Sequence, residues 1–130
     1  MPRVSAAFFL SGALFLLAGV LLGGHMGKTN DYALLTVHTH LNLLGWVTMA
    51  LFGAFYAVRS PPKPHFWPWI HFAITAGGAV LFLAGVTMSR LEAPEANYLP
   101  PLLAGEALLF ISILVFTVAA GWEVFRPRRS

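Results

Sequence analysis

Four long apolar stretches, separated by short polar segments, organise the chain. They cover residues 4–24, 33–58, 67–89 and 99–125, and only two charged side chains fall inside them. Each stretch supplies the ~20 apolar residues that a helix needs to cross a bilayer. Helices are the expected form because a bilayer offers no water to unpaired backbone groups. The pattern predicts one all-α domain over residues 1–130, an integral membrane bundle of four transmembrane helices at about 4–25, 33–58, 67–89 and 99–125.

Composition supports the same class. The chain has 130 residues, of which 58% are hydrophobic and 10% charged, whereas soluble domains carry about 25% charged residues. Cysteine is absent, which excludes disulfides, iron–sulfur clusters and thiolate metal sites. The first stretch is longer than the apolar core of a signal peptide, and Gly23-Gly24-His25-Met26 is no clear cleavage site. We therefore expect a retained helix.

The basic residues predict an orientation. Those near the chain ends and in the second loop mark one side of the bundle, namely Arg3, Arg59, Lys63, Arg126, Arg128 and Arg129. The positive-inside rule places both termini and this loop in the cytoplasm, as in a multi-pass protein of a bacterial-type inner membrane. The net charge of +3 thus reflects contact with the lipid bilayer, and nucleic acid is not an expected partner.

Two histidines in the second stretch are the main candidates for chemistry. From His38 to Val58 there is no Asp, Glu, Lys or Arg. Successive helical residues turn by about 100°, so His38 and His40 should point to nearly opposite sides, roughly 7–11 Å below the outer boundary. Polar side chains at this depth require partners. Diverging imidazoles suit two planar cofactors, or one cofactor and one supporting role, better than a single chelated ion. Asn42, one turn further on, could orient His38.

Other polar residues are weaker candidates. Glu106 should reach the depth of the two histidines, and a carboxylate inside a membrane is a functional candidate. His25 is expected to be an interfacial side chain or an axial ligand from above. His71 should lie on the inner side as a structural, hydrogen-bonded residue, and His65 should belong to an interfacial aromatic belt.

A longer motif resembles a known family. The residues that carry it are His38-x-His40-x-x-x-Leu44-Gly45-Trp46-Val47-x-Met49-x-x-x-Gly53-Ala54-x-Tyr56. This pattern is similar to the tenth helix of subunit I of cbb-type cytochrome c oxidases, in the haem–copper oxidase superfamily. The entry and exit of the next helix also resemble that family, at His65-Phe66-Trp67 and Thr87-Met88-Ser89-Arg90. The resemblance covers residues 31 to about 125.

The resemblance implies haem b as a cofactor. It would make His38 the proximal ligand of a high-spin haem and His40 an axial ligand of a low-spin haem, with Arg90 near the propionates. The family's three-histidine copper site, cross-linked tyrosine and opposing low-spin ligand belong to helices that have no counterpart here. Stand-alone oxidase activity is therefore not expected.

Three hypotheses follow. The first is a small haem protein for electron transfer or for binding NO or O2, whose missing axial ligand comes from His25, Met88 or a second copy in a homo-oligomer. The second is a cofactor-free accessory or assembly subunit of a larger membrane oxidase or reductase complex, with the histidines hydrogen-bonded to Glu106 and Asn42. The third is a copper-handling protein that uses His38, His25 and Met88. It is disfavoured because the chain has only four methionines.

Overall fold

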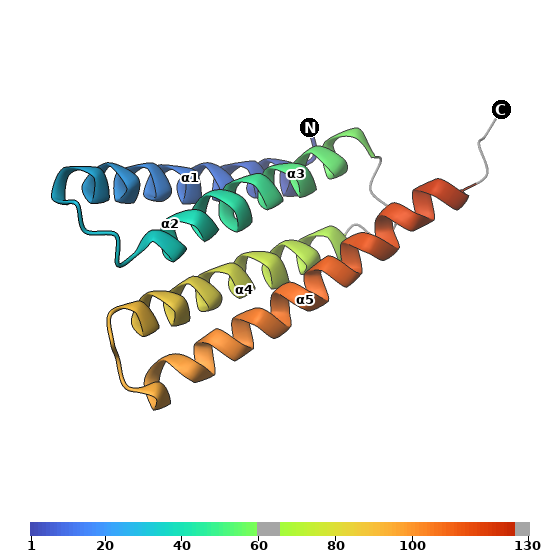
Figure 1. Ribbon diagram of the computed structural model, residues 1–130. Coiled ribbons are helices and arrows are strands. Elements are labelled where there is room, and N and C mark those ends of the chain that lie inside the picture. The colour runs from blue at the N-terminus through green and yellow to red at the C-terminus, as the bar shows by residue number, and fades with distance from the viewer. Residues whose placement is uncertain (60–65, 127–130) are drawn as a thin grey trace.

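The computed structural model describes residues 1–59 and 66–126 and consists of long helices (Figure 1). Four of its helical rods are long and apolar enough to cross a membrane: Arg3–Thr29, Leu35–Val58, Trp67–Arg90 and Glu95–Phe125. The described ranges contain no strand. The predictions of an all-α fold and of four membrane-length helices are confirmed. His65, Lys63, Arg128 and Arg129 lie outside the described residues.

The helices pair as two hairpins. In the first, α1 (Arg3–Thr29) packs against a rod made of α2 (Leu35–His40), η1 (Leu41–Thr48) and α3 (Met49–Val58). In the second, α4 (Trp67–Arg90) packs against α5 (Glu95–Phe125). The first hairpin meets the second mainly through α4, and α5 lies on the far side of α4 (Figure 1). Most of the surface of α5 is therefore free of protein contacts.

Two helix ends differ from the sequence-based expectation. Helix α1 continues to Thr29 and ends where Asn30 adopts the left-handed conformation, with φ 53°, a common way to terminate a helix. Helix α5 begins at Glu95 and contains Pro100 and Pro101. Their missing N–H groups leave carbonyls of the exposed first turn unpaired, and such carbonyls can be solvated. The expected start near residue 99 was about one turn too late.

Glycines set the distance between paired helices. A Cβ at Gly45 would lie 2.5 Å from the Cβ of Phe15 on α1, and a Cβ at Gly85 would lie 2.6 Å from the backbone nitrogen of Leu102 on α5. A Cβ at Gly105 would overlap the backbone nitrogen of Phe82. Small residues of this kind let helix backbones approach closely where no hydrophobic effect drives helix association in lipid.

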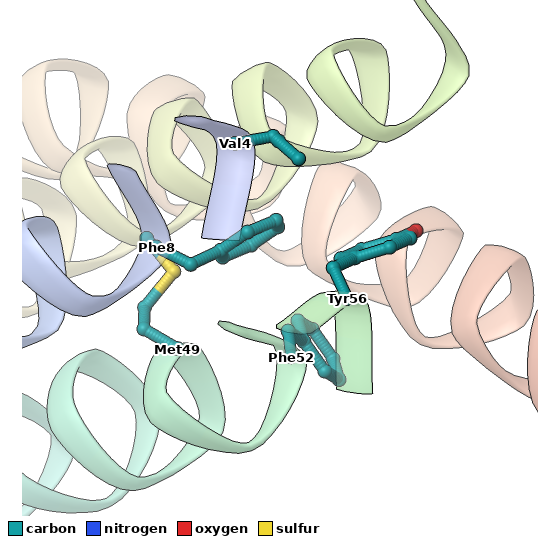
Figure 2. Packing of buried hydrophobic residues seen from close by; sticks show 5 residues of the cluster. All are labelled: Val4, Phe8, Met49, Phe52 and Tyr56. Carbon is teal, nitrogen blue, oxygen red and sulfur yellow. The ribbon is translucent and has the colours of Figure 1, made fainter. Parts of the chain in front are cut away.

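Aromatic side chains fill the core at the end of the bundle that holds the N-terminus. Phe8 and Met49 are fully buried, and they pack with Val4, Phe52 and Tyr56 (Figure 2). The rings of Phe8 and Tyr56 stack at 5.8 Å. A second cluster, closer to the histidine pair, joins α2 and η1 to α4 and consists of Val37, Leu41, Leu83 and Val86.

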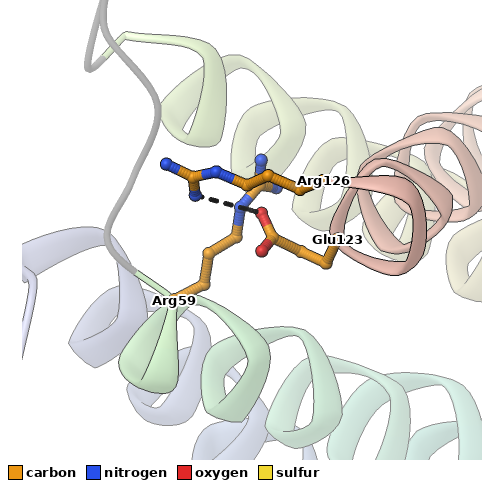
Figure 3. Close-up of polar contacts among 3 residues, drawn as sticks. All are labelled: Arg59, Glu123 and Arg126. Atoms are coloured by element: carbon orange, nitrogen blue, oxygen red, sulfur yellow. Dashed lines mark ion pairs between the residues drawn. The ribbon is translucent and has the colours of Figure 1, made fainter. Parts of the chain in front are cut away.

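An ion pair connects the two hairpins at the end of the bundle that holds the N-terminus. Arg59, just after α3, places its Nε 2.5 Å from Oε1 of Glu123 on α5, and Arg126 lies 3.8 Å from the same oxygen (Figure 3). The Arg59 side chain is only 9% exposed. The two close atoms do not have hydrogen-bond geometry, so the attraction is mainly Coulombic. It draws α5 toward the first hairpin.

Gly105→Ala should destabilise the protein, whereas Gly121→Ala in the same helix should not. Overpacking against the Phe82 backbone costs about 1–3 kcal/mol. At position 121 nothing lies within 4 Å, and alanine is favoured over glycine in a helix by up to ~1 kcal/mol. Unfolding in a mixed-detergent titration, followed by circular dichroism, measures both changes. Equal stability of the two variants would contradict the close approach of α4 and α5.

Arg59→Met should lower the free energy of unfolding by about 1–3 kcal/mol. This is less than the 3–5 kcal/mol for breaking a fully buried pair, because part of the Glu123 carboxylate reaches solvent. Arg126→Met is the matched control. Arg126 is half exposed, so its loss should cost less than ~1 kcal/mol. The same detergent titration compares the two, and a larger effect at Arg126 would show that Arg59 is not the main partner of Glu123.

Candidate functional site

The histidine pair lies directly before an unusual segment of helix. His38 and His40 end α2, and η1 continues from Leu41 to Thr48 as a π-helix. The hydroxyl of Thr48 donates to the carbonyl of Leu43, five residues back. π-Helical turns are rare and occur frequently at functional sites. No sequence pattern pointed to this feature, which begins at the residue after His40.

His38 faces α1. Its Nδ1 lies 2.8 Å from the carbonyl oxygen of Gly19. A carbonyl only accepts, so Nδ1 carries the proton and donates it. A Cβ at Gly23 would lie 2.7 Å from Cε1 of the His38 ring. The ring therefore lies where only a glycine at position 23 of α1 leaves it space.

Asn42 holds the same ring from below, as its spacing suggested. Its Nδ2 donates to the backbone carbonyl of His38 at 3.0 Å and lies over the face of the ring, 3.3 Å from Nε2 and 3.4 Å from Nδ1. The amide nitrogen is nearly equidistant from the two ring nitrogens and so does not lie along the in-plane lone pair of Nε2. The His38 ring is thus held by Gly19 at its edge and covered by Asn42. The Oδ1 of Asn42 is buried without a hydrogen-bond partner, next to Gly19.

His40 faces the other way, toward α4. Its Nδ1 lies 2.8 Å from the carbonyl of Thr36 in the preceding turn, and its ring packs 5.1 Å from the ring of Phe82. By the same reasoning Nδ1 carries the proton. Among the described residues, none makes a hydrogen bond to Nε2 of His40. The predicted divergence of the two imidazoles is confirmed, and their environments differ: the His38 ring is held by Gly19 and covered by Asn42, whereas Nε2 of His40 receives no hydrogen bond from the described residues.

The remaining predicted site residues do not converge on this pair. Glu106 is exposed on α5, and the described residues give it no hydrogen bond or ion pair with a histidine. Its neighbour Gly105 packs on Phe82, which also touches His40, so Glu106 is near the level of His40 with α4 between them. His25 and Arg90 are exposed at the ends of α1 and α4. In the described part of the chain, no three His, Asp or Glu side chains form a metal-binding group.

His71 has the structural role that was expected for it. It is 1% exposed. Nδ1 lies 2.9 Å from the hydroxyl of Tyr56 on α3, and Nε2 lies 3.0 Å from that of Ser112 on α5. Thr75 completes the set, 2.6 Å from Ser112. Only the spacing of His71 and Thr75, one helical turn, could have revealed part of this network. Tyr56 and Ser112 are distant in sequence and were not recognised as partners.

The donor order in this network follows from one bond. The hydroxyl of Thr75 donates to the backbone carbonyl of His71 at 2.7 Å, because that oxygen only accepts. Ser112 must then donate to Thr75, and the Nε2–H of His71 must donate to Ser112. The hydroxyl of Tyr56 consequently donates to Nδ1 of a neutral His71. The chain of hydrogen bonds has one direction and uses every polar hydrogen it contains.

Nothing matches this chain in comparisons with protein-family models, with curated proteins or with solved structures. The likeness to oxidase subunit I consequently rests on the sequence motif around His38 and His40. What the two histidines do has to be argued from their surroundings.

Histidine tautomers test these assignments. We expect the neutral rings of His38 and His40 to carry the proton on Nδ1 and that of His71 to carry it on Nε2, because each assignment follows from a carbonyl acceptor or from the donor order. Nuclear magnetic resonance of the 15N-histidine-labelled protein distinguishes the two forms. Single His→Gln variants assign the signals. A neutral His71 protonated on Nδ1 would reverse the proposed chain of donors.

Proposed function

We propose that this chain is a small membrane haem protein that binds one haem b through His40. The observation that carries the proposal is the state of that ring. Its Nδ1–H is held by the Thr36 carbonyl at 2.8 Å, and the described residues supply no hydrogen bond to Nε2. Metal-ligating histidines usually have this arrangement, in which the outer nitrogen fixes the ring and the other faces the metal.

The donor set suits haem better than a bare ion. A haem needs only one or two axial ligands, whereas a structural or catalytic zinc or copper site needs about three protein ligands. One free imidazole beside the Phe82 ring meets the haem requirement. Arg90 lies eight residues beyond Phe82 on α4, about 12 Å toward the helix end, where a guanidinium could pair with propionates at the membrane surface.

We do not assign His38 as a second ligand. Its Nδ1 bonds to the carbonyl of Gly19, Asn42 covers its ring, and a Cβ at Gly23 would meet its Cε1 at 2.7 Å, so the protein already surrounds this ring. We assign His38 to positioning: it fixes α1 against α2 and so supports the helix that carries His40. The resemblance to oxidase subunit I, in which both histidines are ligands, applies here to His40 alone.

The source of a second axial ligand sets the activity. An open position would allow NO or O2 to bind, and a closed one would favour electron transfer. Within the chain the candidates are His25 and Met88; outside it, a second copy. Glu106 favours an oligomer or a larger complex, because intramembrane carboxylates rarely face lipid and this one is exposed on α5. We place both termini on the cytoplasmic side of a bacterial-type inner membrane by the positive-inside rule.

A cofactor-free accessory or assembly subunit is the second candidate. The observation that favours it is the contact of the His38 ring with protein groups, which the accessory hypothesis anticipated for Asn42. The Glu106 bond that it also anticipated has no counterpart in the described residues. This function predicts co-purification with a larger oxidase or reductase and no haem in this chain.

His40→Ala should abolish the Soret band of the purified or haem-reconstituted protein. Loss of a residue that only supports a metal ligand weakens binding by 10–100-fold, so loss of the ligand itself should exceed ~100-fold. His38→Ala should retain haem, and its affinity for haem should fall by no more than the 10–100-fold expected for a supporting residue. Thr39→Ala, an exposed neighbour, is the control. Titration with haem, followed optically, measures the affinities. The assignment would be overturned if His38→Ala lost the Soret band and His40→Ala kept it. A wild-type protein without a Soret band would favour the accessory function.

A further inference from the structure

A cavity of about 360 Å³ lies between α3, α4 and α5, at the end of the bundle that holds Arg59. This volume is within the range of small-molecule pockets. Trp67 and Trp122, both more than half exposed, stand at its edge. Val115 and Val118 form part of an apolar wall and reach the outer surface of α5. In a bilayer the cavity would therefore open sideways, at the interfacial level that tryptophan prefers.

The cavity has a polar floor with one unused acceptor. Tyr56 and His71 line it, and the hydroxyl of Tyr56 points toward α5 (Figure 2). That hydroxyl gives its hydrogen to His71, and the remaining hydrogens of the network are used between His71, Thr75 and Ser112. The phenolic oxygen of Tyr56 retains lone pairs and receives no hydrogen bond from the described residues. A ligand that bonds to this oxygen must therefore be a donor.

Charge in the cavity selects against an anion. Arg59 lines the cavity, but its guanidinium is paired with Glu123, 2.5 Å away. Arg126, the more distant and half-exposed partner of that carboxylate, is not among the residues that line the cavity. A phosphate or carboxylate head would have to displace that carboxylate. Guanidinium N–H groups that Glu123 does not occupy can still donate to a neutral oxygen. The floor thus suits a neutral head that offers an O–H to Tyr56 and an oxygen to Arg59.

Aromatic and aliphatic walls define the rest of the ligand. Tyr56, His71, Trp67 and Trp122 supply flat surfaces against which an aromatic ring packs well, and the valines of α5 continue as an apolar path toward the lipid. We propose that this cavity binds a membrane-soluble quinol: a neutral hydroxylated ring with an apolar tail. The site is independent of the haem proposal.

The donor order makes the ligand preference specific. A quinol O–H can donate to the oxygen of Tyr56, whereas the carbonyl of the corresponding quinone cannot and would face another acceptor. The quinol complex has a hydrogen bond at the Tyr56 oxygen, whereas the quinone complex leaves that oxygen unpaired. Such a difference corresponds to a change in affinity of about tenfold. We expect decylubiquinol to bind about tenfold more tightly than decylubiquinone. Calorimetric titration of the full-length protein in detergent, under anaerobic conditions, measures both.

Two variants test the location. Ala119 lines the cavity, so Ala119→Phe should fill it and weaken decylubiquinol binding by more than ~10-fold. Ala104→Phe, at an exposed position of the same helix, should leave binding unchanged. Tyr56→Phe should remove the preference for quinol over quinone. Circular dichroism establishes which variants are folded. If Tyr56→Phe fails to fold, the proposal is still tested by the preference of the wild type for quinol over quinone and by the comparison of Ala119→Phe with Ala104→Phe.

Three results would overturn the proposal: no saturable binding of decylubiquinol, equal binding by Ala119→Phe and the wild type, or quinone binding as tight as quinol. Displacement of decylubiquinol by short-chain phosphatidylglycerol would instead identify the cavity as a site for an anionic lipid head. None of these results depends on whether His40 holds haem, since the titrations use protein that has not been loaded with haem.

Discussion

The requirement that polar groups find partners inside the protein governs this structure. Within a bilayer no water is present to form a hydrogen bond with an unpaired polar group. The buried polar side chains obey this rule almost completely: His71, Thr75 and Ser112 bond to one another across two helices, and Ser5 donates to the carbonyl of Gly53. Nε2 of His40 and the phenolic oxygen of Tyr56 receive no hydrogen bond from the described residues, so at these two atoms a partner from outside the chain could supply one.

The glycines of α1 make the rule possible at the histidine pair. The carbonyl of Gly19 reaches the His38 ring at a place where a Cβ at Gly23 would meet that ring at 2.7 Å and a Cβ at Gly19 would meet Asn42 at 2.7 Å. The same glycines thus allow both the close packing of α1 and the contacts of the His38 ring. That ring takes part in packing against α1, whereas the Nδ1 of His40 bonds to the carbonyl of Thr36 in its own helix and to no neighbouring helix.

The sequence predicted what depends on local periodicity and little of what depends on contacts across helices. The four rods follow from hydropathy, and the divergence of His38 and His40 follows from the helical turn. The expected start of α5 near residue 99 was wrong because Pro100 and Pro101 lie close to the start of the helix, where the carbonyls that they leave unpaired are in an exposed turn. The π-helical segment has no periodic signature. The partners of His71 are 15 and 41 residues away in the sequence. A structural role for His71 could therefore be predicted, but its bonds to Tyr56 and Ser112 could not.

The two candidate sites share α4 but not a common space. Phe82 touches His40 near one end of the bundle, and His71 lines the cavity near the other. Eleven residues of helix separate them, about 16 Å along the axis, and the core cluster of Phe8, Phe52 and Tyr56 packs around His71 on the side of the first hairpin. Apart from the shared α4, a ligand beside His40 would meet α2, whereas a ligand in the cavity would meet α3 and α5. Helix α4 lines both sites, so a coupling between them has a continuous path along this helix.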